Sequence, residues 1–139
     1  MNKLLLIFLA SIMSVTNLAA QDGHDGHAHS NSNEGEVHDL GNISIAGTTF
    51  RVISYGEITP GSEAVIGIEV EQGKAPSQLR AWIGVRNGRG SVKYLLYGDS
   101  HGHFHGHLEV PSKLPHGSEV WLDVTTEAGR QLGAASIPE

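Results

Sequence analysis

Four histidines stand at every second position of the segment SHGHFHGHLEV, residues 100–110. They are His101, His103, His105 and His107. Imidazole, together with carboxylate, is a ligand set that suits Zn(II), Cu(II) and Ni(II). The chain has no cysteine, and both of its methionines lie within the first 20 residues, so sulfur ligands are missing elsewhere. The segment therefore predicts a site for a divalent transition metal rather than for Cu(I), which favours sulfur.

The spacing of these histidines limits how they can share an ion. On a β-strand they lie on one face, and the other face is apolar, with Phe104, Leu108 and Val110. Because the apolar side chains must face the core, the imidazoles are predicted to point outward. Positions two apart are separated by about 6.6 Å and the outermost pair by about 20 Å, whereas a metal holds nitrogen at about 2.0–2.1 Å. Neighbours such as His105 and His107 can share one ion, but four histidines of a straight strand cannot.

Several sources of further ligands stay open. A turn at Gly102 can fold His101 and His103 toward one metal, or ligands can come from the next strand, from His116 or from an N-terminal tail. That tail, residues 21–36, reads QDGHDGHAHSNSNEGE and has no large apolar residue, so it is predicted to be disordered. It carries a second histidine cluster, made of His24, His27 and His29. Strand and tail together favour capture and hand-over of an ion; the alternative is a polar, functionally silent strand face.

The first 20 residues, MNKLLLIFLASIMSVTNLAA, combine one lysine, an apolar run of about a dozen residues and a small-residue end. This is the pattern of a secretory signal peptide cleaved after Ala20, and the apolar run is too short to span a membrane. We therefore expect a periplasmic or secreted protein whose mature chain has no membrane span. Without Lys3 the chain keeps 8 Lys+Arg against 15 Asp+Glu, a formal charge of −7, which argues against nucleic-acid binding.

From residue 37 onward, apolar and polar residues alternate in short segments separated by turn signals, as in EAVIGIEVE (63–71) and EVWLDVTT (119–126). Seven to eight such strands and no amphipathic helix predict an all-β domain over residues 37–139. The expected fold is an antiparallel β-sandwich of immunoglobulin-like architecture, with a small closed barrel as the alternative. The turn signal NGRG (87–90) predicts a tight hairpin that pairs QLRAWIGVR (78–86) with SVKYLLY (91–97).

Two tryptophans, Trp82 and Trp121, fall opposite the aliphatic faces of their strands. Outward tryptophans indicate a partly covered sheet surface, either a partner-binding patch or a surface covered by the N-terminal segment. A partner-binding patch would make the protein an immunoglobulin-like interaction module whose histidines are only a solvated strand face. No serine lies in a nucleophile-elbow motif, and the sequence has no His-Glu-x-x-His helix and no phosphate-binding loop, so we expect no catalytic activity.

The segment HFHGHLEVPSKLPHGSEVWLDVTTEAGR, residues 103–130, resembles small exported bacterial proteins with an immunoglobulin-like fold, the YtkA-like family. The resemblance lies in a His-x-His-hydrophobic-Glu-Val-Pro strand, a Leu-Pro-x-Gly loop and a strand that contains tryptophan. It implies an accessory domain associated with heavy-metal efflux, and it singles out His105 and His107 as the metal-binding pair. We therefore predict an exported, non-catalytic protein that buffers a divalent metal ion or passes it to an efflux or uptake component.

Overall fold

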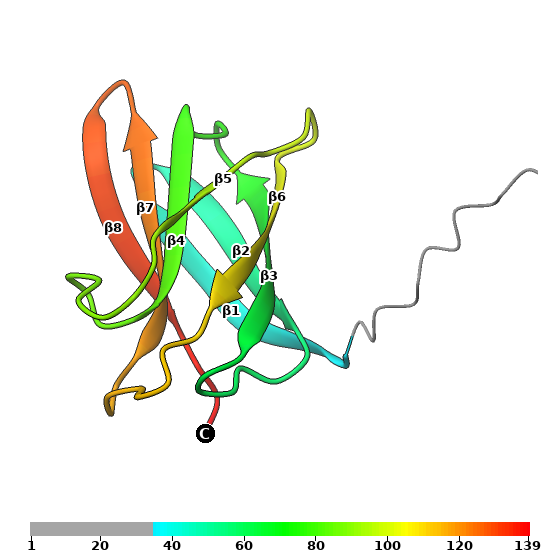
Figure 1. Ribbon diagram of the computed structural model, residues 1–139. Coiled ribbons are helices and arrows are strands. Elements are labelled where there is room, and N and C mark those ends of the chain that lie inside the picture. The colour runs from blue at the N-terminus through cyan, green and yellow to red at the C-terminus, as the bar shows by residue number, and fades with distance from the viewer. Residues whose placement is uncertain (1–34) are drawn as a thin grey trace, which may run out of the picture. The chain divides into compact units, whose positions relative to one another are not determined.

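Eight β-strands and no helix make up the part of the chain that the structure, a computed structural model, describes, residues 35–139 (Figure 1). The predicted signal peptide and the tail up to residue 34 lie outside the described residues. No helix among the described residues is long and apolar enough to cross a membrane. The strands are β1 (Val37–Ile45), β2 (Thr48–Tyr55), β3 (Glu63–Gln72), β4 (Gln78–Gly84), β5 (Tyr94–Leu96), β6 (His103–Glu109), β7 (Glu119–Thr126) and β8 (Gly129–Ser136).

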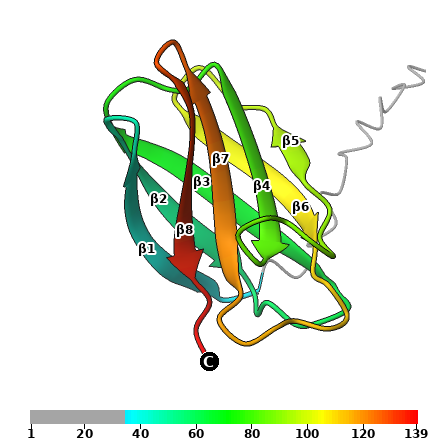
Figure 2. The same cartoon turned by 90° about the vertical axis from the view of Figure 1, so that its left-hand side faces the viewer.

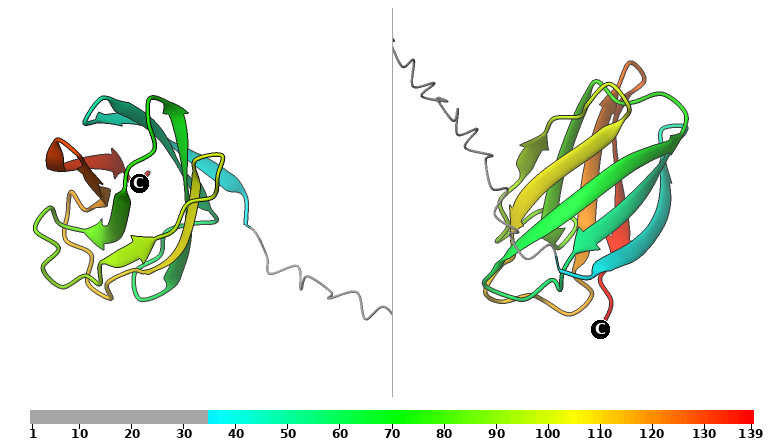
Figure 3. Two further views of the ribbon diagram at one scale, coloured as in Figure 1. Left: turned by 90° about the horizontal axis from the view of Figure 1, so that it is seen from above. Right: turned by 90° about the vertical axis from the view of Figure 1, so that its right-hand side faces the viewer.

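The strands form two antiparallel sheets of four strands each. One sheet has the order β1-β2-β3-β6 and the other the order β5-β4-β7-β8. The two sheets face each other, as Figure 2 and the view from above in Figure 3 show. The prediction of an all-β fold with seven to eight antiparallel strands is therefore confirmed.

The core lies between the two sheets and consists of side chains at every second position of their strands. This alternation is the reason why the sequence pattern could give the phase of the strands. Each fully buried aliphatic or aromatic side chain contributes about 1.5–3 kcal/mol relative to an exposed one. The largest contributors are Phe50 and Val52 of β2, Ile66 and Ile68 of β3, Leu79 and Ile83 of β4, Leu108 of β6, and Val120, Leu122 and Val124 of β7.

The tight hairpin predicted at NGRG is wrong, because a loop of residues 85–93 separates β4 from β5. Inside this loop the amide of Gly88 donates to the carbonyl of Val85 at 2.8 Å. The side-chain oxygen of Asn87 accepts a hydrogen bond from the amide of Arg89 at 2.9 Å. The Asn-Gly pair thus shapes a turn within a long loop. The predicted pairing of the two flanking segments is confirmed over three residue pairs, because β4 and β5 are antiparallel neighbours.

The end of the predicted tail is tied to the sheet at its last two residues. Gly35 and Glu36 belong to the described residues, and the amide of Gly56 donates to the carbonyl of Glu36 at 2.9 Å. A Cβ atom on Gly35 would come within 2.6 Å of the Cα atom of Gly56, so the two backbones pass each other closely. Strand β1 begins directly after these residues, at Val37.

Candidate metal-binding strand and its turn

The histidine-rich strand β6 lies at the edge of its sheet and pairs with β3 alone in the ladder (Figure 3, right, where β6 is yellow). Its side chains alternate between exposed and buried from His103 to Glu109. Phe104, Gly106 and Leu108 are buried, and the histidines point outward. The predicted phase of this strand is thus confirmed. We call the outward side of β6, with His103, His105 and His107, the histidine face.

Two glycines explain how β6 is fixed in this phase. A Cβ atom on Gly98 would lie 2.7 Å from the ring of Phe104, so that ring packs directly on the glycine backbone. A Cβ atom on Gly106 would lie 2.4 Å from the side chain of Leu96, which fills the space beneath the strand. A slip by one residue would expose Phe104 and bury imidazoles, which is strongly unfavourable. The outward direction of the histidines therefore follows from packing on the opposite side of the strand.

His105 and His107 form a close pair on the histidine face. Their ring centroids are 5.4 Å apart, with an angle of 82° between the planes. In the antiparallel register, His105 lies opposite Gly67 and His107 opposite Val65 of β3. Because Gly67 has no side chain, the ring of Tyr55 from β2 reaches toward His105, with the centroids 6.1 Å apart. The pair therefore stands on a packed surface and not on a flexible segment.

A carboxylate from β3 contacts this pair. Nδ1 of His107 lies 2.7 Å from Oε1 of Glu63, a hydrogen-bond distance. Glu63 pairs in register with Glu109, the next outward-facing residue of β6 after His107, so two acidic residues lie on neighbouring strands at this end of the histidine face. The sequence reasoning did not identify Glu63 as part of the site. Only the pairing of β3 with β6, 44 residues apart, brings it there.

The other two strand histidines meet at a turn, which we call the Asp99 turn (residues 98–103). The amide of Gly102 donates to the carbonyl of Asp99 at 3.2 Å, and the amide of Asp99 donates to the carbonyl of His103 at 2.9 Å. Gly102 has a φ of +80°, a left-handed conformation that favours glycine. The rings of His101 and His103 are 6.3 Å apart and nearly stacked, at 29°. A turn at Gly102 was one of the arrangements that the sequence left open.

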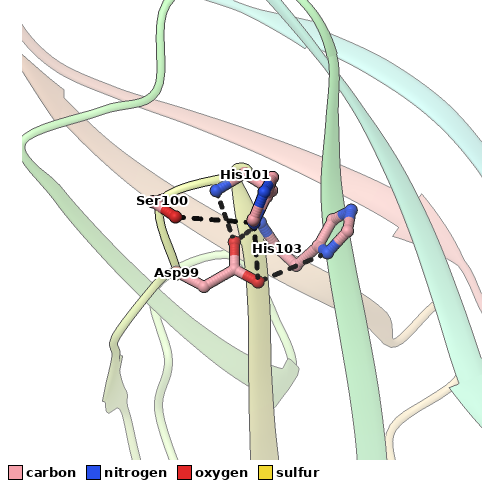
Figure 4. Close-up of polar contacts among 4 residues, drawn as sticks. All are labelled: Asp99, Ser100, His101 and His103. Atoms are coloured by element: carbon pink, nitrogen blue, oxygen red, sulfur yellow. Dashed lines mark hydrogen bonds and ion pairs between the residues drawn. The ribbon is translucent and has the colours of Figure 1, made fainter.

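The carboxylate of Asp99 lies beside both imidazoles (Figure 4). Its Oδ1 accepts the amides of His101 at 2.8 Å and of His103 at 3.0 Å. Its Oδ2 lies 3.4 Å from Nδ1 of His103 and 4.0 Å from Nδ1 of His101. The backbone amide of His103, followed by that of His101, lowers the pKa of Asp99 because both stabilise the ionised form. A negative charge is therefore held next to two potential nitrogen ligands. The sequence reasoning missed Asp99, although Asp followed by Gly three residues later is a common turn signal.

No group of three or more His, Cys, Asp or Glu side chains within residues 35–139 has an arrangement ready to hold a metal ion. His38 lies on β1, and His116 lies in the loop that leads to β7. Neither of these two side chains contacts a histidine of β6 or of the turn before it. The predicted tail ligands His24, His27 and His29 lie outside the described residues.

The two tryptophans lie on the outer face of the other sheet, where β4 pairs Trp82 with Trp121 of β7. Trp82 is fully buried rather than solvent-facing, because the 85–93 loop covers it: Nζ of Lys93 lies 4.4 Å from the ring centroid. The indole N–H of Trp82 donates to the carbonyl of Val85 at 2.8 Å. The prediction of a partly covered surface that includes Trp82 as a partner-binding residue is therefore corrected: Trp82 is not accessible, and among the described residues its cover comes from the 85–93 loop.

Trp121 is half-buried in the same layer. Its indole N–H donates to the carbonyl of Gly84 at 3.0 Å, and the guanidinium of Arg86 lies 5.7 Å from its ring centroid. The two indole rings stack with centroids 6.3 Å apart. The 85–93 loop thus lies between solvent and the buried Trp82 ring. The histidine face of the other sheet is exposed to solvent.

Comparison with known proteins adds no relative to this description. No protein-family model, no curated protein and no solved structure matches the chain. The functional proposal below is therefore based on the residues of the histidine face and of the Asp99 turn.

Proposed function

We propose that the chain is an exported, non-catalytic β-sandwich protein that binds a divalent transition metal, Zn(II), Cu(II) or Ni(II), at His105 and His107. The observation that carries the proposal is the arrangement of these two imidazoles. They stand side by side on the outward face of a strand whose opposite side is anchored in the core. Imidazole with nearby carboxylate is the ligand chemistry of these ions.

The contact between His107 and Glu63 supports this function in a second way. When Nδ1 of an imidazole donates to a carboxylate, the lone pair of Nε2 is free to bind a metal. Such a carboxylate also orients the ring and makes the ligand more basic. Glu63 lies 2.7 Å from Nδ1 of His107, and both side chains are more than half exposed, so an ion in solvent can reach the pair.

An ion held by two histidines and water would exchange readily, because most of its coordination sphere stays open to other ligands. This suits a buffer or a carrier rather than a structural metal site. The proposed signal peptide, His-rich tail and immunoglobulin-like form of the sandwich, together with the resemblance to YtkA-like proteins, support a periplasmic role next to a metal efflux or uptake component. The acidic net charge of the chain raises the local concentration of cations.

Equilibrium dialysis of the mature chain against Zn(II), Cu(II) and Ni(II) tests the proposal. The variant His105→Ala/His107→Ala is expected to bind one ion fewer, or to bind it at least about tenfold more weakly, since the paired nitrogens are removed. The matched control is His38→Ala/His116→Ala, which removes two histidines from other parts of the described domain. Equal stoichiometry and affinity in all three proteins would refute the site.

Metal binding is expected to weaken in acid, because protonated imidazole cannot bind a metal. The fold should persist in mild acid. The amide of Gly41 and the guanidinium of Arg51 hold the pKa of Asp39 below its ordinary value, so the stability from that contact is present above the ordinary value and is lost only as the pH falls below it. Dialysis at about pH 7.5 and pH 5, with circular dichroism as the control for folding, checks this. Unchanged affinity at the lower pH would contradict binding through histidine.

A further inference from the structure

The Asp99 turn brings together three potential metal ligands that are not part of the His105/His107 pair. Its backbone hydrogen bonds and the left-handed Gly102 reverse the chain directly before β6. This reversal sets the imidazoles of His101 and His103 beside one carboxylate (Figure 4). On a straight strand Asp99 would lie on the same face as both histidines but about 13 Å from His103, so the turn is what brings the carboxylate close to both imidazoles.

The two oxygens of Asp99 have different tasks. Oδ1 accepts two backbone amides and so fixes the side chain in the turn. Oδ2 is directed to Nδ1 of His103 at 3.4 Å and to Nδ1 of His101 at 4.0 Å. The carboxylate is therefore already oriented, and only the imidazoles need to adjust. They are free to do so, because the side chains of His101 and His103 are 80% and 60% exposed.

The distances from the carboxylate of Asp99 to the two imidazole nitrogens are close to the ligand–ligand distances at a metal ion. Metal–ligand bonds of about 2.0–2.2 Å separate two ligands of a tetrahedral ion by about 3.4 Å. The Asp99–His103 distance of 3.4 Å fits this value, and the Asp99–His101 distance of 4.0 Å is longer by a fraction of an ångström. The centroids of the His101 and His103 rings are 6.3 Å apart, so both exposed imidazoles must rotate toward Asp99 before their nitrogens can reach one ion.

We propose that Asp99, His101 and His103 form a second site for a divalent transition metal, with Asp99 as its carboxylate ligand and one position left for water or an exchanging ligand. The site takes the same class of ion as the proposed function and so depends on that function, but it does not need the His105/His107 pair. His105 packs toward Tyr55 and His107, whereas His103 turns toward Asp99. The histidines of one strand thus divide between two ions instead of sharing one.

The decisive variant is Asp99→Asn. The asparagine side-chain oxygen can still accept the two backbone amides that Oδ1 accepts, so the turn is kept, but the second oxygen becomes an amide nitrogen, which is a poor metal ligand. The matched control is Asp39→Asn, because Asp39 also accepts a backbone amide, from Gly41 at 2.9 Å, and has no recorded contact with a histidine. All variants are made in the mature chain with His24, His27 and His29 replaced by alanine, so that tail histidines do not compete.

Zn(II) alone is the probe, and two readouts are needed: equilibrium dialysis for stoichiometry, and NMR of the imidazole and backbone resonances for location. We expect two ions in the parent, with the imidazoles of His101 and His103 responding to one of them. Asp99→Asn should weaken the binding of that ion by about tenfold or more and leave the response of the His105/His107 signals to Zn(II) and the backbone fold of the turn unchanged. Asp39→Asn should bind as the parent does.

The outcomes separate the two proposals. If Asp99→Asn binds Zn(II) as the parent does, or if the rings of His101 and His103 do not respond to the ion, the second site is overturned while the first stands. If the parent binds a single ion that His105→Ala/His107→Ala abolishes, the division into two sites is likewise wrong. If no histidine ring responds to Zn(II) in the parent, both the second site and the proposed function fail.

Discussion

The variant Phe104→Ala is expected to lose about 3–5 kcal/mol of unfolding free energy, which is the usual cost of removing a buried phenylalanine. Domains of this size have only about 5–15 kcal/mol in total. The ring of Phe104 is 7% exposed and packs on the bare backbone of Gly98, which has no side chain of its own to fill the cavity. Because β6 is an edge strand with one ladder partner, this ring is a main anchor of the histidine face.

Urea denaturation followed by circular dichroism measures this effect. Tyr97→Ala is the matched control, since Tyr97 is also aromatic and lies close in sequence, but is 80% exposed. The urea concentration at the unfolding midpoint should change very little in this control. Zn(II) should raise the midpoint of Phe104→Ala, because an ion that binds only the folded chain stabilises it by mass action, by about 2.7 kcal/mol at 100 times its dissociation constant. A loss below about 1 kcal/mol in Phe104→Ala would contradict the anchoring role.

The variant Trp82→Ala is expected to destabilise the domain by about 3–5 kcal/mol as well. Trp82 is the largest fully buried side chain, and its removal would leave a cavity between the sheet and the 85–93 loop. It would also remove the hydrogen bond to the carbonyl of Val85 and the contact with Lys93. A tryptophan that served only to bind a partner would instead leave the unfolding free energy nearly unchanged.

Trp121→Ala provides the comparison, because Trp121 occupies the same layer but is half-buried, and it should cost less than Trp82→Ala. Fluorescence gives a second check, since the chain has two tryptophans in all. In Trp121→Phe the remaining emission comes from Trp82 and should be blue-shifted and poorly quenched by acrylamide. Red-shifted, readily quenched emission would mean that the 85–93 loop is open in solution.

The strand phases were predictable because apolar residues at every second position can be buried in only one way. Phe104, Leu108 and Val110 direct the histidines outward, and Val120, Leu122 and Val124 do the same for Trp121. The long loop of residues 85–93 was not predictable from the turn signal at 87–90. Asn-Gly suits a tight turn in any setting. Here residues 85–93 instead pack over the outer face of the sheet, where Lys93 and Arg86 contact the rings of Trp82 and Trp121.

The sequence by itself determined which side chains the candidate site can offer, the outward direction of the histidines and the all-β character of the domain. These depend on residue types and on local periodicity, which a single chain segment contains in full. The tertiary structure decided which carboxylates meet the imidazoles and that Trp82 is covered. Glu63 reaches His107 through the pairing of β3 with β6, and Asp99 turns its second oxygen to His101 and His103 through the hydrogen bonds of its turn. Such contacts depend on strand register and backbone path, which no spacing within a single strand specifies.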